Sequence, residues 1–136
     1  MTYEALVTDT HPLIWYFCTD QHKLSKKARQ SFDDAVGKRS KAIYVPSPVL
    51  WELSILMDDN RIRISIPFID LMDKLFKNQM IIEQPFDRQV VAEYHGLHFS
   101  NDPFDKAIVA TALLLQMPLI TADGVIHDTK PCDLYW

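Results

Sequence analysis

The hydrophobic and polar positions divide the chain into short apolar runs that alternate with longer amphipathic stretches. The apolar runs have the length of buried strands and predict strands at residues 3–8, 42–45, 80–82 and 119–121. Between them, apolar side chains recur at helical spacing and predict helices at residues 13–17, 25–36, 48–58, 67–77, 87–95 and 102–115. This alternation predicts an α/β fold, in which helices cover both faces of a mostly parallel central sheet to form a three-layer α/β/α sandwich.

Residues with capping preferences mark several boundaries of these predicted helices. Ser25, Ser47 and Asp87 are predicted N-caps, because their side chains accept hydrogen bonds from the first free N–H groups of a helix. Gly96 follows the helix at residues 87–95 and is predicted to end it in a left-handed conformation. Residues 61–64 alternate between Arg and Ile, but the run is too short to be assigned to a helix or a strand.

Size and composition indicate one globular domain over residues 1–136, with 48% hydrophobic and 24% charged residues. Only three glycines occur, which excludes a glycine-rich phosphate loop. The formal net charge of −4 argues against binding of nucleic acid by bulk charge, although a bound cation can reverse the charge of an acidic pocket. Basic residues cluster at 23–29 and 38–41, where solvated helix faces are the preferred interpretation.

Neither the cysteines nor the start of the chain indicates export. Cys18 and Cys132 provide no disulfide framework and no metal-binding spacing, so reduced thiols are expected. The first residues lack the basic region of a signal peptide. The apolar run near Leu6 is interrupted at Thr8 and Asp9, which is too early for a membrane span. We therefore expect a cytoplasmic protein with no membrane segment.

Four widely separated acids stand where strands end or helices begin. Asp9 follows the first predicted strand and Asp123 follows the last, so both belong at the carboxyl edge of a parallel sheet, where ligand sites form. Glu52 lies in the first turns of the helix after the second strand, and Asp105 lies in the first turn of the helix before the last strand. Carboxylates held close together repel one another, and a hard divalent cation such as Mg²⁺ or Mn²⁺ is the usual compensation.

Each acid also has a simpler interpretation. Asp9 can cap the first helix, and Asp123 is typical of a turn. Glu52 can be a solvated charge favoured by the helix dipole. Asp102 and Asp105 have the spacing of a capping box, with Asp102 as the cap. Convergence of the acids is therefore the hypothesis that the structure must test.

The histidines do not suggest a metal site of their own. His11 adjoins Asp9, and a packed or capping histidine is preferred there over a contact with phosphate. His95 and His98 flank Gly96, so a single helix cannot present both, and no zinc site is expected.

Four segments follow one another in a recognisable order, and each contains one of the four acids. They are residues 9–15, 47–53, 101–112 and 119–123. Together they resemble the four motifs of PIN domains, in particular those of the VapC-type toxin ribonucleases of type II toxin–antitoxin systems. The resemblance extends from about residue 6 to residue 136, which is essentially the whole chain.

The resemblance implies a PIN-like fold, bound Mg²⁺ or Mn²⁺ and endonucleolytic cleavage of RNA. By position in the motifs, the catalytic and metal-binding acids are Asp9, Glu52, Asp105 and Asp123. Asp102 is either a further ligand or only a helix cap, and the hydroxyls of Thr10 and Thr121 assist through hydrogen bonds. The resemblance also implies a cognate antitoxin as protein partner, and a homodimer.

Two other hypotheses are kept. One is a PIN-like domain that is weak in catalysis and acts mainly by binding protein or RNA. The other is a phosphoacceptor or phosphatase domain that uses Asp9, but such domains commonly need a second acid beside the first. Thr10 and His11 follow Asp9 instead, so we rank this hypothesis lower.

Overall fold

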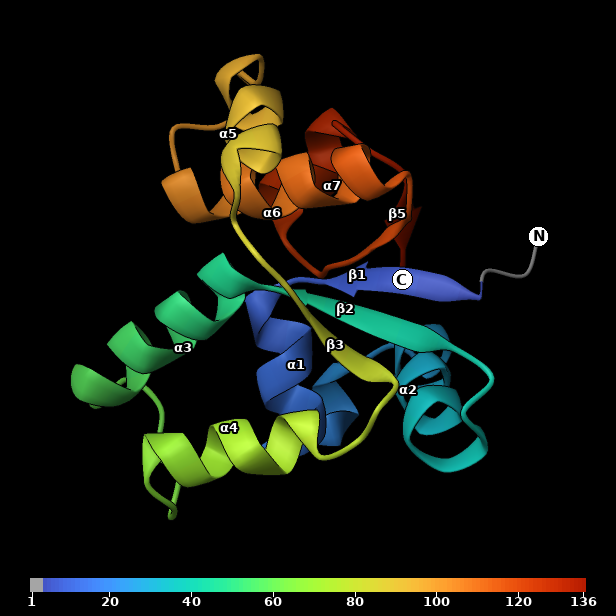
Figure 1. Ribbon diagram of the computed structural model, residues 1–136, viewed down its shortest axis with the longest axis vertical. Coiled ribbons are helices and arrows are strands. Elements are labelled where there is room, and N and C mark those ends of the chain that lie inside the picture. Colours follow the sequence, from blue (N-terminus) through green and yellow to red (C-terminus); the bar gives the residue numbers. More distant parts are fainter. Residues whose placement is uncertain (1–3) are drawn as a thin grey trace.

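A five-stranded parallel sheet forms the centre of the computed structural model, which describes residues 4–136 (Figure 1). Its strands are β1 Ala5–Thr8, β2 Ala42–Pro46, β3 Ile81–Gln84, β4 Leu119–Ile120 and β5 Leu134–Tyr135. Each neighbouring pair is parallel, which confirms the predicted sheet. The first predicted strand begins at Ala5 in the described part of the chain, and residue 3 of that prediction lies outside it.

Helices cover both faces of the sheet and complete the predicted α/β/α sandwich. They are α1 Thr10–Phe17, α2 Lys26–Asp33, α3 Ser47–Asp58, α4 Phe68–Phe76, α5 Arg88–His95, α6 Pro103–Leu115 and α7 Gly124–Thr129. A 3₁₀ turn, η1 Gln21–Lys23, and a π turn, η2 Asp34–Lys38, lie on either side of α2. Helices α5, α6 and α7 lie on one face of the sheet, and α1, α2 and α4 lie on the other (Figure 1).

The strand order β3-β2-β1-β4-β5 places the reversal of chain direction beside the central strand β1. The chain moves outward from β1 through β2 to β3 and then returns to the other side of β1 with β4. Register pairs Thr8 with Ile120, and the Asp9 N–H donates to the Ile120 carbonyl at 2.9 Å. The carboxyl ends of β1 and β4 are therefore adjacent, at the kind of switch point where open α/β sheets bind ligands.

The core explains why the strands read as continuous apolar runs rather than alternating ones. Leu6 and Val7 point to opposite faces of β1, and both are fully buried because both faces carry helices. On the face with α1 and α2, Phe32 is fully buried, and Tyr16 stacks on it with ring centroids 4.9 Å apart.

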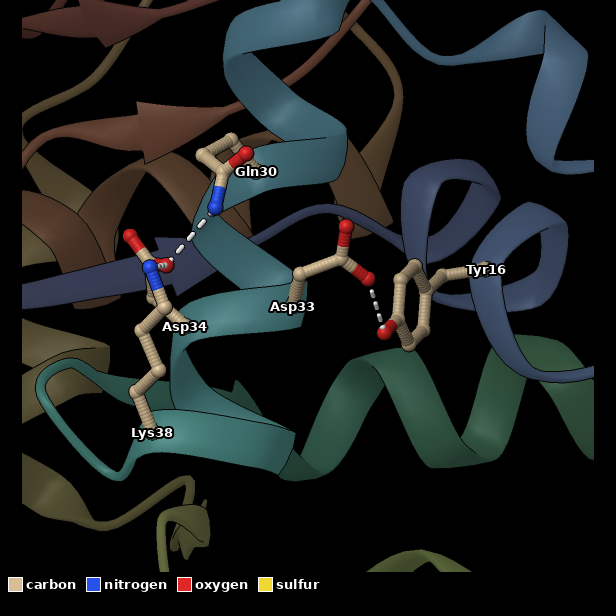
Figure 2. Close-up of polar contacts among 5 residues, drawn as sticks. All are labelled: Tyr16, Gln30, Asp33, Asp34 and Lys38. Carbon is tan, nitrogen blue, oxygen red and sulfur yellow. Dashed lines mark hydrogen bonds and ion pairs between the residues drawn. The ribbon is translucent and has the colours of Figure 1, made fainter.

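Polar contacts connect α1 with α2 and continue into the π turn (Figure 2). The Tyr16 hydroxyl donates to the Asp33 carboxylate at 2.6 Å, and burial together with this bond raises the pKa of Tyr16. Gln30 donates to Asp34 at 2.8 Å, and Lys38 forms an ion pair with the same carboxylate at 3.8 Å. Only the Tyr16–Asp33 bond joins α1 to α2. The Lys38–Asp34 ion pair has an exposed lysine, so it contributes little to stability.

Two predicted helix boundaries are wrong. Pro46, not Ser47, occupies the N-cap position of α3, and the Ser47 hydroxyl instead donates to Glu83 and to the Gln84 carbonyl of β3. Gly96 has φ −84° and is not left-handed, because its N–H bonds back to upstream carbonyls in an ordinary right-handed turn. The left-handed residues that follow helices in residues 4–136 all have side chains: Arg39, Asn60, Gln116 and Lys130.

Helix α7 and strand β5 were not predicted from the sequence. Helix α7 buries one residue, Ile126, and is too short to show a helical period. Strand β5 has two residues and is held by its pairing with β4. Residues 61–64 form neither helix nor strand, although Ile62 and Ile64 pack against the core. Lys41, expected in a solvated group, is only 8% exposed.

Both cysteines are free thiols, as expected, and both are half-buried. Burial is the main cause that raises the pKa of Cys18, and it also raises the pKa of Cys132, to about 12. Within residues 4–136, none of the helices has the length and apolar character needed to cross a bilayer.

Candidate metal centre

One cavity of about 330 Å³ at the carboxyl edge of the sheet contains all the acids singled out from the sequence. They line it from five positions in the chain: Asp9, Glu52, Asp102, Asp105 and Asp123. Asp9 comes from the end of β1, Glu52 from α3, and the others from the N-terminal ends of α6 and α7. The fold therefore brings together residues that are far apart in sequence.

Asp9 is the most deeply placed of these acids, with only 7% of its surface exposed. One carboxylate oxygen accepts from the Thr10 N–H at 2.8 Å, and the other accepts from the Thr121 hydroxyl at 2.7 Å. Burial raises the pKa of Asp9, and the bonds from Thr121 and Thr10 oppose that rise. Asp9 thus both caps α1 and lines the cavity, so the two interpretations of this residue do not exclude each other.

Two threonine hydroxyls connect the acids to one another. The Thr10 hydroxyl donates to the Glu52 carboxylate. The Thr121 hydroxyl donates to Asp9 and accepts from the Asp123 N–H at 3.1 Å. The hydrogen bonds expected of both threonines are therefore present, and they restrict the positions of Asp9 and Glu52.

Asp123 is the N-cap of α7. Its carboxylate accepts from the Ile126 N–H at 2.9 Å while the side chain stays half-buried beside the cavity. Behind it, His127 Nε2 lies 2.6 Å from the Thr121 carbonyl oxygen. The turn predicted at Asp123 is thus the start of a helix that the sequence pattern did not reveal.

At the N-terminus of α6, one acid caps the helix and a different acid lies beside the cavity. The Asp102 carboxylate accepts from the N–H groups of Phe104 at 2.8 Å and Asp105 at 3.1 Å, so Asp102 is the cap. Within residues 4–136, no hydrogen bond returns from the Asp105 side chain to the cap, so the predicted capping box is only half formed. Asp105 is half-buried beside the cavity instead.

Asp105 experiences the combined charge of the cavity. Its pKa is raised from an ordinary 3.8 to about 7, first by burial and then by the negative charges of Asp102, Asp9, Asp123 and Glu52. Asp105 therefore lies beside the other acids of the cavity and not in the helix cap.

The family model of the PIN domain matches residues 6–130. The chain belongs to the PIN-domain family. This match confirms the resemblance found in the four sequence motifs.

Solved structures with the same fold cover nearly the whole PIN domain. VapBC2 from Rickettsia felis, bound to a DNA fragment from its promoter, has a TM-score of 0.64 at 15% identity, over 97% of this chain and 99% of that one. FitAcB from Neisseria gonorrhoeae has a TM-score of 0.61 at 17% identity, over 95% and 96%. A toxin–antitoxin complex from Klebsiella pneumoniae has a TM-score of 0.59 at 15% identity, over 95% and 99%. No curated protein matches by sequence.

The donors around the cavity of this PIN domain suit a hard divalent cation. All five acids offer carboxylate oxygens, which Mg²⁺ and Mn²⁺ prefer. Burial is the first cause of the raised pKa of Asp105, and the negative charges of the other four acids add to it; a cation in the cavity would offset those charges. In the described part of the chain no three His, Cys, Asp or Glu side chains already stand together as a metal cluster. Among the five acids, Asp105 is the one whose carboxylate is least restrained by hydrogen bonds within residues 4–136.

Two side chains of the cavity, Trp15 and His11, differ from what the sequence suggested. Trp15 was not expected to line the cavity, and His11 was expected to be packed or capping. Trp15 lines the cavity, and its ring lies 5.9 Å from that of His11, one helical turn away. His11 is exposed and does not cap α1, so it is neither a core nor a capping histidine, although its ring packs beside that of Trp15. The i, i+4 spacing of these residues on a helix that starts at Asp9 was the available signal.

Proposed function

We propose that this PIN domain is an endoribonuclease that cleaves RNA phosphodiester bonds with Mg²⁺ or Mn²⁺, and that it is the toxin of a toxin–antitoxin pair. The observation that carries the proposal is the convergence of five acids on one cavity at the switch point of the sheet. Asp9, Glu52, Asp105 and Asp123 are the proposed catalytic and metal-binding residues. Asp102 caps α6 and is close enough to add its charge to theirs.

Asp9, Asp105 and Asp123 would hold the cation, with Glu52 as a direct ligand or one that acts through water. When bound, such a cation lowers the pKa of a water molecule and neutralises charge that develops on a phosphate. Thr121 fixes the orientation of Asp9, and Thr10 fixes that of Glu52, so these two carboxylates lose little rotational freedom on binding. Asp105 adapts to the ligand because its carboxylate is not used in the cap.

A cation also resolves the conflict between an acidic cavity and a polyanionic substrate. The chain has a formal net charge of −4, and five acids line the proposed site, so an RNA phosphate would be repelled from the cavity alone. A bound cation makes the local charge less negative or reverses it to positive, so that a phosphate can approach.

The proposed partners follow from the structural neighbours, which include a toxin–antitoxin complex from Klebsiella pneumoniae. By this analogy, an antitoxin protein would bind this chain and block the cavity, and the toxin would form a homodimer in the cytoplasm. The RNA substrate is proposed from the acidic site and the family.

Cleavage of a fluorescent RNA by the purified protein tests the proposal. We expect cleavage with Mn²⁺ or Mg²⁺, none with a chelator, and a loss of about 100-fold or more in Asp9→Asn. Asp128→Asn is the matched control, because Asp128 is an exposed acid of α7 outside the cavity. Circular dichroism verifies that both variants fold. Undiminished cleavage by Asp9→Asn would contradict the proposal.

A second candidate is a catalytically weak PIN domain that acts mainly through protein or RNA binding. The observation in its favour is that no three potential metal-binding side chains among the described residues already form a cluster. Titration calorimetry separates the two candidates, because absence of both Mn²⁺ heat and RNA cleavage would favour the binding role.

A further inference from the structure

A second cavity, of about 310 Å³, lies next to the acidic one and has a very different lining. Four aromatic side chains contribute to it: Trp51, Phe86, Tyr94 and Phe104. They come from α3, α6, α5 and the segment between β3 and α5. We refer to this space as the aromatic cavity.

The aromatic side chains form two edge-to-face pairs, and one member of each pair is exposed to solvent. Trp51 and Phe104 have ring centroids 5.0 Å apart, and Phe86 and Tyr94 have centroids 6.4 Å apart. Trp51 is 65% exposed and Phe86 is 39% exposed. Large apolar rings that stay exposed around a hollow are typical of a binding site, because leaving them in water is unfavourable.

The chain connects the aromatic cavity directly to the acidic one. Trp51 precedes Glu52 on α3, and Phe104 stands between Asp102 and Asp105 at the start of α6. The two cavities therefore share a wall built from these two helices. On both helices, a residue that lines the aromatic cavity is thus next in sequence to an acid of the other cavity.

Positive charge is present at the same place. Lys106 follows Asp105 on α6, and its ammonium group lies 4.4 Å from the centre of the Tyr94 ring. These features match the parts of a nucleotide chain. The aromatic hollow suits a base, the cation at its edge suits a phosphate, and the acidic cavity beside it suits the scissile bond.

We propose that the aromatic cavity binds an unpaired nucleobase of the RNA substrate, stacked on Trp51, next to the phosphodiester bond that is cut. This inference rests on the proposed nuclease function. Ser47 is the only residue with a polar side-chain end among those that line the cavity within residues 4–136, apart from the Trp and Tyr rings. Stacking therefore dominates over reading of base edges, and the cavity accepts different bases in single-stranded RNA.

The test measures binding of uncleaved oligonucleotides. Fluorescence anisotropy follows 2′-O-methyl hexanucleotides, with Ca²⁺ in place of Mg²⁺, and gels verify that they stay intact. Each is compared with an oligonucleotide that has the same backbone and no bases. The variants are Trp51→Leu, Trp51→Phe and Phe86→Leu. Ile69→Ala is the control, because Ile69 is equally exposed but lies on α4, outside the cavity.

We expect Trp51→Leu to weaken binding by about 5-fold to 150-fold, as base–aromatic stacking implies. Trp51→Phe should restore most of the affinity, and Ile69→Ala should bind like the wild type. On the abasic oligonucleotide the difference between Trp51→Leu and the wild type should disappear. Trp51 is exposed, so its replacement removes no core packing, and Phe86→Leu provides a second measurement.

Three results would overturn the inference. The first is that no oligonucleotide binds the wild type. The second is unchanged affinity in both Trp51→Leu and Phe86→Leu. The third is that Trp51→Leu abolishes a dimer in analytical ultracentrifugation and leaves affinity unchanged, because a second copy of the chain would then cover the cavity. Trp51-dependent binding without cleavage would refute the nuclease function alone. Metal-dependent cleavage that Trp51→Leu does not alter, in kcat or KM, would refute the stacking site alone.

Discussion

At the scale of single residues, the acids of the cavity differ in how strongly the protein holds them. Asp9 accepts two hydrogen bonds and is buried, and Glu52 accepts one from Thr10. Asp105 is half-buried, its pKa is raised to about 7, and its carboxylate receives no hydrogen bond within residues 4–136. Partial burial among like charges, with no hydrogen bond to the carboxylate, makes Asp105 sensitive to pH and to a cation.

The free energy of unfolding of the metal-free protein should therefore fall as pH rises from about 4 to about 7. Asp105 has a pKa of about 7 in the fold against an ordinary 3.8, so the folded state binds more protons in this interval. Asp105→Asn should be more stable than the wild type by about 1 kcal/mol at pH 8, a value reduced for solvent screening of a half-exposed group. At pH 4 the two should be equal.

Urea denaturation at both pH values, with a chelator present, measures this difference. Asp128→Asn, which removes an exposed acid outside the cavity, should show no comparable gain at pH 8. Equal stability of Asp105→Asn and the wild type at pH 8 would mean that Asp105 does not experience the charges of the other acids.

At the scale of elements, helix termini decide what each acid can do. Asp102 uses its carboxylate to cap α6, and this frees Asp105, one turn later, for the cavity. Asp123 performs the same capping for α7 and still lines the cavity. An acid can therefore cap a helix and also bind a metal, provided that one of its carboxylate oxygens still points into the cavity.

Substitution of Asp102 should separate its cap from its charge. Asp102→Ala should lower the free energy of unfolding by about 1 kcal/mol, whereas Asp102→Asn should have little effect, because Asn caps as well as Asp. If Asp102 acts as a cap, RNA cleavage by Asp102→Asn should stay within a few-fold of the wild type.

Asp87 provides the matched control, because it caps α5 through Gln89 and Val90 and does not line the acidic cavity. Asp87→Ala and Asp87→Asn should reproduce the two stability effects without any change in cleavage. A loss of cleavage in folded Asp102→Asn as large as that in Asp9→Asn would instead identify Asp102 as a ligand.

At the scale of the whole molecule, strand order assembles the cavity. The reversal beside β1 joins the end of β1 to the end of β4, and helices α3, α6 and α7 direct their N-terminal turns to the same edge. No single segment contains the site, so binding of a cation there should couple to folding of the entire domain.

Mn²⁺ should therefore raise the melting temperature of the protein by several degrees. A cation at about 100 times its Kd stabilises the folded state by ~2.7 kcal/mol, provided that it does not bind the unfolded chain. Differential scanning fluorimetry with and without Mn²⁺ measures the shift. Asp105→Asn should lose most of it and Asp128→Asn should keep it. An equal shift in both variants would place the cation outside the cavity.

The sequence predicted most elements and the acids, but not every local conformation. Asp9 and Asp123 were placed at the sheet edge from the strands that precede them, and the structure has both there. Gly96 was predicted to be left-handed, yet Gln116 and Lys130 adopt that conformation, because tertiary packing and not glycine content decides how a helix ends. Helix α7 escaped prediction because a single buried residue shows no period.

The sequence by itself determined the alternation of strands and helices, and the chemistry of the acids within the motifs. Only the tertiary structure decided that these acids share a cavity. Asp9 and Thr121 are separated by 112 positions and meet because β1 pairs with β4, and no local pattern encodes that pairing. It arises from the burial of both faces of the sheet, which depends on all the helices together. The same packing half-buries Asp105 among four other negative charges, and that environment, not its place in a motif, sets its pKa.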